Sequence, residues 1–402
     1  MGLQLQGLKG KRLYKFKILS VDSGLLLNEA DKERVIEVLS TLKNYNLSLY
    51  FVVQNMQEKK QAEKFIKVYK LCAEIIKVNS PVDKANKLLS LVKPRSETKI
   101  QKKINAGKKI FHLGKRKSRF IDVFESPEGV VCHDFYKLVW GSQCPFDCSY
   151  CFLQLTYRIY PYIQQYLNFD DLFKEMKRLN ERVDKPVILN TGELSDSLAL
   201  DHITNITNKI IKKSLEFENI RLLLLSKSNQ VNHLDSVPPG KAICSMSLNI
   251  PGNINKFERG TASVTERIEA LKNAEKKGYE IRCRIDPIIT WSENWEKAYN
   301  NLIKNLFARV SPQIVTLGQP RFYPMLLNII KKRNPEAGEY FAEDSVLSAG
   351  KRKRVSDEQR FKIYKKLIEM VEKYGSTDIA LCKEDPKLHR DLNINQISCN
   401  CI

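Results

Sequence analysis

The stretch CPFDCSYC, from Cys144 to Cys151, decides how this sequence is interpreted. It places three thiols at a C-x3-C-x2-C spacing, directly after an apolar segment that we expect to be a strand. A structural zinc site needs four ligands, and no fourth ligand is obvious nearby, because Cys132 and His133 lie across that strand. Three thiolates instead suit a 4Fe–4S cluster in which one iron keeps an open position. An open metal position can bind and activate a second molecule.

The sequence around this loop predicts a parallel α/β fold. From about Asp134 onward, apolar segments alternate with amphipathic helical patterns, which is typical of βα units. Several segments are apolar throughout, as in a sheet that is covered on both faces. Six units are too few for a closed eight-fold barrel, so we expect an open partial (β/α)6 barrel with its chemistry at the carboxyl ends of the strands. The predicted strands are YKLVWGS, PVILNTG, IRLLLLSK, AICSMSLNI, YEIRCRIDPII and QIVTLGQP, and the predicted helices are 170–180, 201–213, 264–277 and 295–307.

The segments on either side of the barrel have different compositions. Residues 1–125 predict a small N-terminal α/β domain, residues 126–325 the barrel, and residues 326–402 a C-terminal extension with a helix over 358–373. Within the first domain, residues 93–119 contain eleven basic residues and one acidic residue, which predicts a basic connector with one short strand, KKIFHLG.

The bulk composition favours a polyanionic partner and a cytoplasmic location. The net charge is +21 over 402 residues, which points first to nucleic acid. The alternative is an organism whose proteins are all lysine-rich. No run of 18 apolar residues is present and the first residues lack the apolar core of a signal peptide, so we expect no membrane span. Ten cysteines in a cytoplasmic chain do not predict a disulfide framework.

At this point the sequence resembles the radical S-adenosylmethionine (SAM) superfamily, and more narrowly its spore photoproduct lyase family. The resemblance covers roughly residues 108–321. It implies a 4Fe–4S cluster on Cys144, Cys148 and Cys151, whose open iron binds SAM. It also implies reductive cleavage of SAM to a 5′-deoxyadenosyl radical, which abstracts hydrogen from a substrate, and an electron donor such as flavodoxin or ferredoxin. The stretches that carry it are CSYCFLQLTYRIYPYIQQYLN, SDSLALDHIT, LLSKSNQVNHL, SMSLN and FERGTASVTERIEALKNAEKKGYEIRCRIDPI.

The resemblance also implies which residues contact SAM. The aromatic residue before the third cysteine matches a position that packs on the adenine. The TGE turn after the second strand matches the turn that receives the methionyl amine, where a carboxylate faces an ammonium group. The implied SAM-binding residues are Tyr150, Thr191, Gly192, Glu193, Lys227 and Ser247.

Two departures from the family concern the return of hydrogen to the product. Lyases of this family carry a hydrogen-donor cysteine where this chain has Glu193, and a tyrosine where it has Phe152. We therefore expect that this protein repairs the thymine dimer of spores in another way or not at all. Cys399 and Cys401 have three interpretations: idle thiols in a disordered tail, hydrogen donors that enter the barrel, or ligands of a second metal site shared with Cys382.

The basic residues after the last barrel strand are candidates for contacts to nucleic acid. They are Lys351, Arg352, Lys353 and Arg354, and the other interpretation is a solvated turn before a helix. Arg321, at the expected barrel mouth, is a candidate to hold an anionic substrate group, and the neighbouring Phe322 and Tyr323 suit either base stacking or core packing.

Three functions remain in competition. The leading hypothesis is a radical SAM enzyme that repairs a lesion or modifies a base in a nucleic acid or nucleotide. The second keeps the enzyme class and takes a peptide, a protein or a small molecule. The third is a non-catalytic nucleic-acid-binding protein with a structural metal site. The TGE turn and Tyr150 disfavour the third, because a structural site needs neither.

Overall fold

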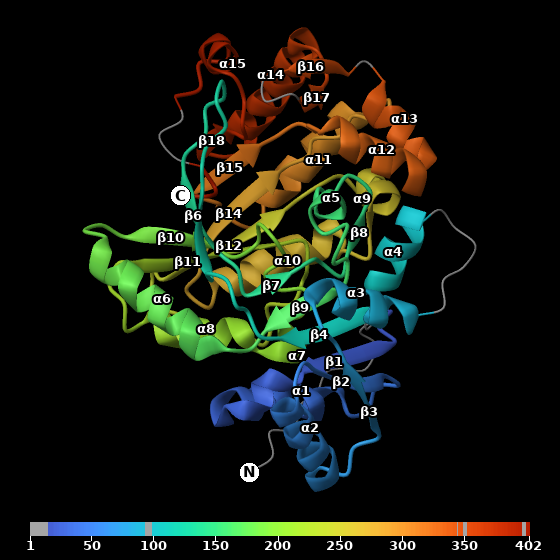
Figure 1. Cartoon of the computed structure of the whole chain (residues 1–402). Helices are drawn as coiled ribbons and strands as arrows, with labels where there is room; N and C mark the ends of the chain where they lie inside the picture. The colour runs from blue at the N-terminus through green and yellow to red at the C-terminus, as the bar shows by residue number, and fades with distance from the viewer. Residues whose placement is uncertain (1–14, 93–98, 344, 349–351, 396–398) are drawn as a thin grey trace.

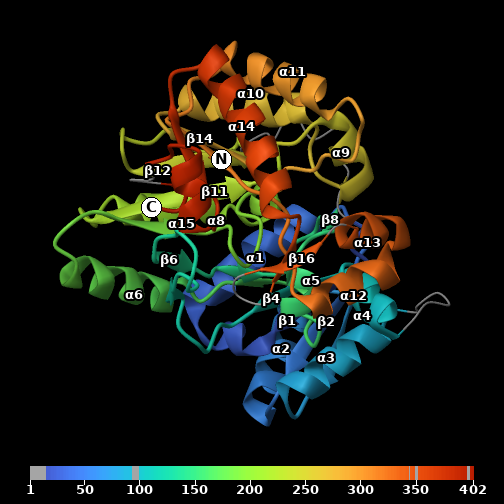
Figure 2. The ribbon, with the colours of Figure 1, turned by 90° about the horizontal axis from the view of Figure 1, so that it is seen from above.

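The computed structural model describes residues 15–92, 99–343, 345–348, 352–395 and 399–402. Its centre is formed by two sheets covered by helices (Figure 1). The N-terminal helix α2 (Met56–Val68) lies at the opposite end of the molecule from α11 (Trp295–Phe307) and α14 (Asp357–Tyr374) in both views. The helix α3 (Pro81–Ser90) lies beside α2 at that end in the view from above (Figure 2). The largest apolar cluster contains side chains of both sheets, so the two halves share one core.

The first sheet has the strand order β3-β2-β1-β4-β9-β7, parallel except for the last pair. Its central strands β1 and β4 are buried along their whole length, so helices must cover both faces. Three of those helices begin at a side-chain cap, provided by Asn28, Asn55 and Ser80. The elements are β1 Ile18–Asp22, the 3-10 helix Ser23–Leu27, α1 Glu29–Leu42, β2 Ser48–Val53, β3 Ala73–Lys77, α4 Lys99–Gly107, β4 Ile110–Gly114, β7 Gly141–Ser142 and β9 Ile163–Tyr166.

The second sheet has the order β5-β6-β10-β11-β12-β14-β15-β18 and is the predicted barrel. All strands from β6 to β18 are parallel, and β5 is antiparallel at one edge. The six predicted strands are adjacent and in the predicted order, which confirms the open barrel, and β18 adds a seventh parallel strand. The strands are β5 Ile121–Phe124, β6 Phe135–Leu138, β10 Val187–Asn190, β11 Ile220–Ser226, β12 Ala242–Ser247, β14 Glu280–Ile285, β15 Ile314–Leu317 and β18 Asp378–Leu381.

Helices and small hairpins complete the second half. The helix α14 packs against α11 over the second sheet (Figure 2). Two short antiparallel pairs, β8 with β13 and β16 with β17, shape the loops. The remaining elements are α5 Leu153–Thr156, α6 Phe169–Arg182, α7 Asp201–Thr204, α8 Ile206–Ser214, α9 Pro251–Phe257, α10 Val264–Glu275, α12 Pro324–Arg333, α13 Pro335–Ala342, α15 Pro386–Asp391, β8 Asp147–Cys148, β13 Glu258–Arg259, β16 Val346–Ser348 and β17 Arg352–Arg354.

Two local predictions were wrong. The single helix expected over 201–213 breaks into α7 and α8 at Asn205, which adopts a left-handed conformation (φ 47°) that asparagine tolerates. The basic connector expected over 93–119 contains the helix α4, whose buried Ile104 and Ala106 lie in a segment that is otherwise mostly polar.

The division of the chain at residue 125 stays a prediction, and the sheets show how the two parts are joined. Strands β7 and β9 come from beyond residue 125 yet belong to the first sheet. The cysteine loop lies between them in sequence. It is therefore anchored at both ends in the first sheet while it faces the second. Among the helices of the described part of the chain, none is both long and apolar enough to cross a membrane.

Candidate active site

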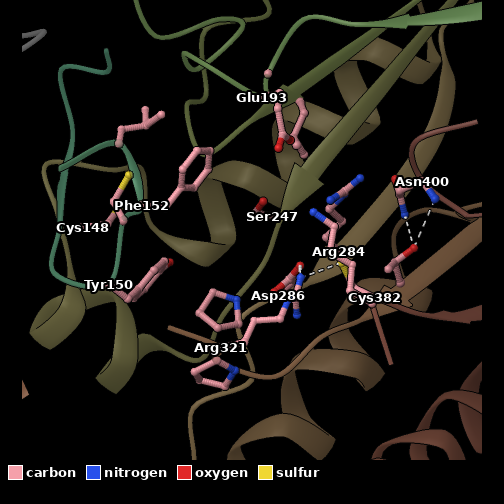
Figure 3. A pocket seen from close by; sticks show the side chains of 18 of the residues that line it. Cys148, Tyr150, Phe152, Glu193, Ser247, Arg284, Asp286, Arg321, Cys382 and Asn400 are labelled. Carbon is pink, nitrogen blue, oxygen red and sulfur yellow. Dashed lines mark hydrogen bonds and ion pairs between the residues drawn. The ribbon is translucent and has the colours of Figure 1, made fainter. Parts of the chain in front are cut away.

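One cavity of about 470 Å³ opens at the carboxyl ends of the barrel strands. The cysteine loop forms one side of it, and the ends of β14 and β15 with the segment Cys399–Cys401 form the other (Figure 3). Most of the residues predicted from the sequence line this cavity: Cys144, Cys148, Tyr150, Cys151, Gly192, Glu193, Lys227, Ser247, Arg321, Arg352, Cys399 and Cys401.

The shape of the cysteine loop is fixed by hydrogen bonds that its backbone carbonyl groups accept from two side chains. The Lys108 ammonium group donates hydrogen bonds to the carbonyl oxygens of Cys144 and Phe146, the latter at 2.7 Å. The Gln154 amide donates to the carbonyl oxygens of Cys148, at 3.3 Å, and Ser149, at 2.9 Å. The short β8–β13 pair ties the middle of the loop to the barrel. Sequence reasoning missed Lys108, which lies far away in the basic connector.

The three thiols of this loop suit a cluster. All are free, Cys144 and Cys148 are buried, and all line the same cavity. Burial raises the pKa of Cys144 and of Cys148, while the nearby ammonium groups of Lys108 and Lys227, respectively, act in the opposite direction. Positive charge beside buried thiols favours the thiolates that iron binds.

A second metal site finds no support in the part of the chain that the structure describes. Among those residues, no group of three or more His, Cys, Asp or Glu side chains is placed to hold a single metal ion. The shared site of Cys382, Cys399 and Cys401 is therefore not formed. The cysteine loop is a different case, because each cysteine of a 4Fe–4S cluster binds a different iron and the thiols need not converge on one point.

Tyr150 is positioned by a buried ion pair that the sequence did not reveal. Its hydroxyl donates to the Glu258 carboxylate at 2.5 Å, and the Arg267 guanidinium donates to the same carboxylate at 2.6 Å. Arg267 also donates to the Ser247 carbonyl oxygen at 2.7 Å. One ion pair therefore fixes two predicted SAM-binding residues. Burial alone would raise the pKa of Glu258, but Arg267 and Lys227 hold it below its ordinary value.

We expect this ion pair to make the fold sensitive to acid. A depressed carboxyl pKa in the folded state gives stability that is complete above the ordinary glutamate pKa of 4.5 and is lost as the pH falls below it. Glu258→Gln should therefore be less stable at neutral pH and lose less stability on acidification, as measured by urea unfolding at several pH values. Glu269→Gln, which removes an exposed partner of Arg309 on α10, is the control and should keep the wild-type profile. Parallel profiles for wild type and Glu258→Gln would contradict the expectation.

The three residues of the TGE turn have different environments. The Thr191 hydroxyl bonds to the Leu223 carbonyl oxygen at 2.9 Å and to the Ser197 hydroxyl at 2.7 Å, so it does not line the cavity. Gly192 packs on Leu225, where a Cβ atom would lie 2.6 Å from the Leu225 Cβ. Only Glu193 points into the cavity (Figure 3). The Thr191 hydroxyl thus has a structural role, and a contact of Thr191 with SAM stays a prediction.

Asp196 is a further site residue that sequence reasoning missed. Its buried carboxylate accepts hydrogen bonds from the Ser226 hydroxyl at 2.7 Å and from the Lys227 backbone N–H at 2.8 Å. It also caps the backbone N–H groups that follow it. Burial raises its pKa in spite of these bonds. The carboxylate thereby ties the end of β11, which carries Lys227, to the TGE turn.

Arg321 lines the cavity within a small charged group. Its guanidinium lies 3.6 Å from the Asp286 carboxylate and donates to the Cys382 sulfur at 2.9 Å. Burial would raise the pKa of Asp286, but Arg321 and Arg284 lower it below the ordinary value. Burial also raises the pKa of Cys382 to about 12. The wall opposite the cysteine loop therefore carries two guanidinium groups and one carboxylate (Figure 3).

The predicted basic contacts fall into three different environments. The Arg352 guanidinium stacks on Tyr323 at 4.5 Å at the cavity rim and donates to its hydroxyl at 2.9 Å. Lys353 pairs through its backbone with Phe322, which is buried, whereas Tyr323 is 44% exposed. Arg354 is buried against the Glu384 carboxylate, so the expected phosphate contact is replaced by a structural ion pair. Lys351 lies outside the described residues.

Comparison with known proteins gives a consistent result. The model of the family described as "Spore photoproduct lyase" matches residues 52–374. The spore photoproduct lyase of Geobacillus sp. is 31% identical over 212 residues, which cover 50% of this chain and 61% of that protein. The Bacillus subtilis enzyme is 30% identical over 209 residues, covering 50% and 60%. The chain thus spans about 60% of the length of the curated relatives that it matches.

Solved structures share the fold. A spore photoproduct lyase complexed with dinucleoside spore photoproduct superposes with a TM-score of 0.68 at 21% identity, over 92% of this chain and 99% of that one. A mutant form with bound AdoMet and dinucleoside spore photoproduct gives a TM-score of 0.67 at 21% identity, over 91% and 98%. The two-sheet architecture is therefore common to this chain and to those proteins.

Proposed function

Because this chain belongs to the spore photoproduct lyase family of radical SAM proteins, we propose that it is an enzyme that starts radical chemistry on a nucleic acid or nucleotide. One observation carries the proposal. A single cavity brings the three loop thiols together with Glu193, Lys227 and Ser247, and it opens beside the basic residues of the rim. The chemistry is either repair of a lesion or modification of a base. A cytoplasmic location is part of this proposal.

Each group of residues has a role in this proposal. Cys144, Cys148 and Cys151 hold a 4Fe–4S cluster, which, when bound, supplies the electron that cleaves SAM. Tyr150 and Lys227 form one wall for the adenosyl part, since the Lys227 ammonium lies 5.9 Å from the Tyr150 ring centre. The Glu193 carboxylate faces the methionyl ammonium group, and Ser247 provides a polar contact. A flavodoxin or ferredoxin is the expected electron donor.

The rim supplies the contacts to nucleic acid. Tyr323 and Phe152 are both substantially exposed and line the cavity, so each has a face on which a base can stack. Arg352 stacks on Tyr323 and holds a positive charge at the same place. Arg321 lies deeper and is suited to an anionic group of a nucleotide that has entered the cavity. A solved relative complexed with dinucleoside spore photoproduct makes a pyrimidine lesion the first substrate to try.

Arg352→Gln is expected to weaken binding to DNA and to reduce its salt dependence. Removal of one phosphate contact lowers the slope of log affinity against log salt concentration by about one. Fluorescence anisotropy with a labelled oligonucleotide at several salt concentrations measures both quantities. Lys362→Gln is the matched control, because Lys362 is an exposed basic residue on the neighbouring helix α14. An equal loss in both variants would mean that only overall charge matters.

The function is tested by the release of 5′-deoxyadenosine. Protein reconstituted with iron and sulfide without oxygen is incubated with SAM and dithionite, with irradiated DNA, untreated DNA, RNA or no nucleic acid. Release that rises with irradiated DNA supports lesion repair. Release that rises with untreated DNA or RNA supports base modification. Release that no nucleic acid changes favours a peptide, protein or small-molecule substrate, and no release under any condition overturns the enzyme proposal.

A further inference from the structure

The segment Cys399–Ile402 is fixed inside the barrel. Its Asn400 side chain is buried and bonds to three barrel strands at once. The amide oxygen accepts from the Ser245 hydroxyl at 2.6 Å, and the amide nitrogen donates to the Cys283 carbonyl oxygen at 2.6 Å and to the Thr316 hydroxyl at 2.9 Å. Figure 3 shows Asn400 on the far side of the cavity from the cysteine loop. A segment bound in this way holds its flanking side chains in set positions.

Two arginines of β14 bind the rest of this segment. Arg282 donates to the carbonyl oxygens of Cys399, at 3.1 Å, and Ile402, at 2.6 Å. Arg284 donates to the Cys401 sulfur at 2.7 Å. The Cys401 backbone N–H points at the Cys399 sulfur at 3.4 Å. Both thiols line the same cavity as the three thiols of the cysteine loop.

The thiol groups of Cys399 and Cys401 are joined by a hydrogen bond, so their protonation is coupled. The hydrogen bond from Cys401, together with the Cys401 backbone N–H and Arg284, lowers the pKa of Cys399 to about 7, although burial opposes this. That same bond and burial raise the pKa of Cys401, which keeps its proton. The charged and titratable groups near the pair include Arg282 and Arg284 on β14, Cys382 after β18, Glu193 after β10 and Cys132 before β6. The thiolate–thiol form of the pair is therefore substantially populated near neutral pH.

A protonated thiol in a radical enzyme can act as a hydrogen-atom donor. An S–H bond is weaker than an alkyl C–H bond, so a thiol gives a hydrogen atom readily to a carbon radical. Cys382 differs in its partner, because its S–H group donates to the Asp286 carboxylate rather than to a second sulfur. The Cys401 sulfur has a guanidinium partner and a neighbouring thiolate instead.

Resting on the proposed function, we propose that Cys401 gives a hydrogen atom to the substrate radical and that Cys399 stabilises the sulfur radical left behind. In the first step the Cys401 S–H bond breaks and a C–H bond forms on the substrate. The unpaired electron then lies on the Cys401 sulfur, and the Cys399 thiolate shares it through a three-electron sulfur–sulfur bond. One electron from the flavodoxin- or ferredoxin-class donor and one proton from solvent restore the thiol and the thiolate.

Solvent deuterium tests the transfer directly, since thiol hydrogens exchange with water. An ultraviolet-irradiated thymidine oligonucleotide is turned over in heavy water, and both product and 5′-deoxyadenosine are measured by mass spectrometry. Wild type should place one deuterium in each product molecule. Cys401→Ala should form at least tenfold less product per 5′-deoxyadenosine, without the deuterium. Cys72→Ala, which removes an exposed thiol of the first half, is the control and should match wild type.

A second measurement separates this proposal from the proposed function. Peptide-resolved alkylation by iodoacetamide across pH should give Cys399 a midpoint near neutral pH, and Cys401→Ala should move it upward. Wild-type product and deuterium in Cys401→Ala would overturn the donor role while 5′-deoxyadenosine release still upheld the proposed function. A Cys399 midpoint at the ordinary thiol value would overturn the coupled protonation of the pair. No 5′-deoxyadenosine from wild type would overturn the proposed function, and the donor role with it.

Discussion

Cys148→Ala is expected to lose its iron and its ability to cleave SAM. The variant keeps only two of the three thiols that line the cavity, and two thiolates leave a 4Fe–4S cluster without a protein ligand on a second iron. Because the cluster residues act as a unit, release of 5′-deoxyadenosine should fall by at least about a thousandfold. Iron and sulfide analysis after reconstitution and the visible absorbance of the cluster provide readouts that do not depend on turnover.

The fold of that variant should survive, which makes the result interpretable. The Cys148 backbone pairs with Glu258, and alanine preserves this pairing. Circular dichroism should therefore show the wild-type secondary structure. Cys72→Ala, in which an exposed thiol is removed, should retain iron and activity. Full iron content in Cys148→Ala would show that the three loop thiols do not hold the cluster.

Glu384→Gln should be the most destabilising single change outside the apolar core. The Glu384 carboxylate is fully buried and is bound by the guanidinium groups of Arg354 and Arg360 and by the Tyr364 hydroxyl, the last at 2.7 Å. Neutralising it removes the carboxylate partner of the buried Arg354 and leaves Arg360 with only the more exposed Asp357 and Asp385. Loss of one partner of such a buried group costs about 3–5 kcal/mol. The free energy of unfolding from urea titration measures the change.

A control on α14, the helix that carries Arg360 and Tyr364, separates burial from charge. Glu358 lies at the start of α14, is exposed and pairs with Lys362. Glu358→Gln removes the same charge from the same part of the molecule and should leave the free energy of unfolding unchanged. Similar losses in both variants would contradict the structural role of Glu384. The cluster around Glu384 also explains why Arg354 is unavailable to nucleic acid while Arg352, two residues earlier, remains at the rim.

The parts of the fold that were predicted correctly have local signals. The six barrel strands are apolar runs, and the helix over 295–307 follows its sequence pattern from the first residue to the last. The cysteine spacing is a local signal too, and its three residues line one cavity. Strands of two residues, such as β7 and β8, are too short to show an alternation of apolar and polar residues. Their place depends on a partner strand that is distant in the sequence.

The contacts that sequence reasoning missed join residues that are distant in the chain. Lys108 reaches the cysteine loop across 36 positions, and Arg354 meets Glu384 across 30. Asp196 has no motif around it, and its importance follows only from the backbone groups that converge on it. The position of Cys401 beside Arg284 depends on how the segment 399–402 packs inside the open barrel. Contacts of this kind leave no periodicity in the sequence.

The anchoring of the cysteine loop between β7 and β9 couples cofactor loading to the stability of the first sheet. The antiparallel β7–β9 pair closes the loop, and β9 is paired along its length with β4. A ligand that binds the cysteine loop only when β7 and β9 are paired also stabilises this pairing, by mass action. The N-terminal half is therefore a thermodynamic partner of the metal centre. Its slowest-exchanging amide protons should become slower still once the cluster is in place.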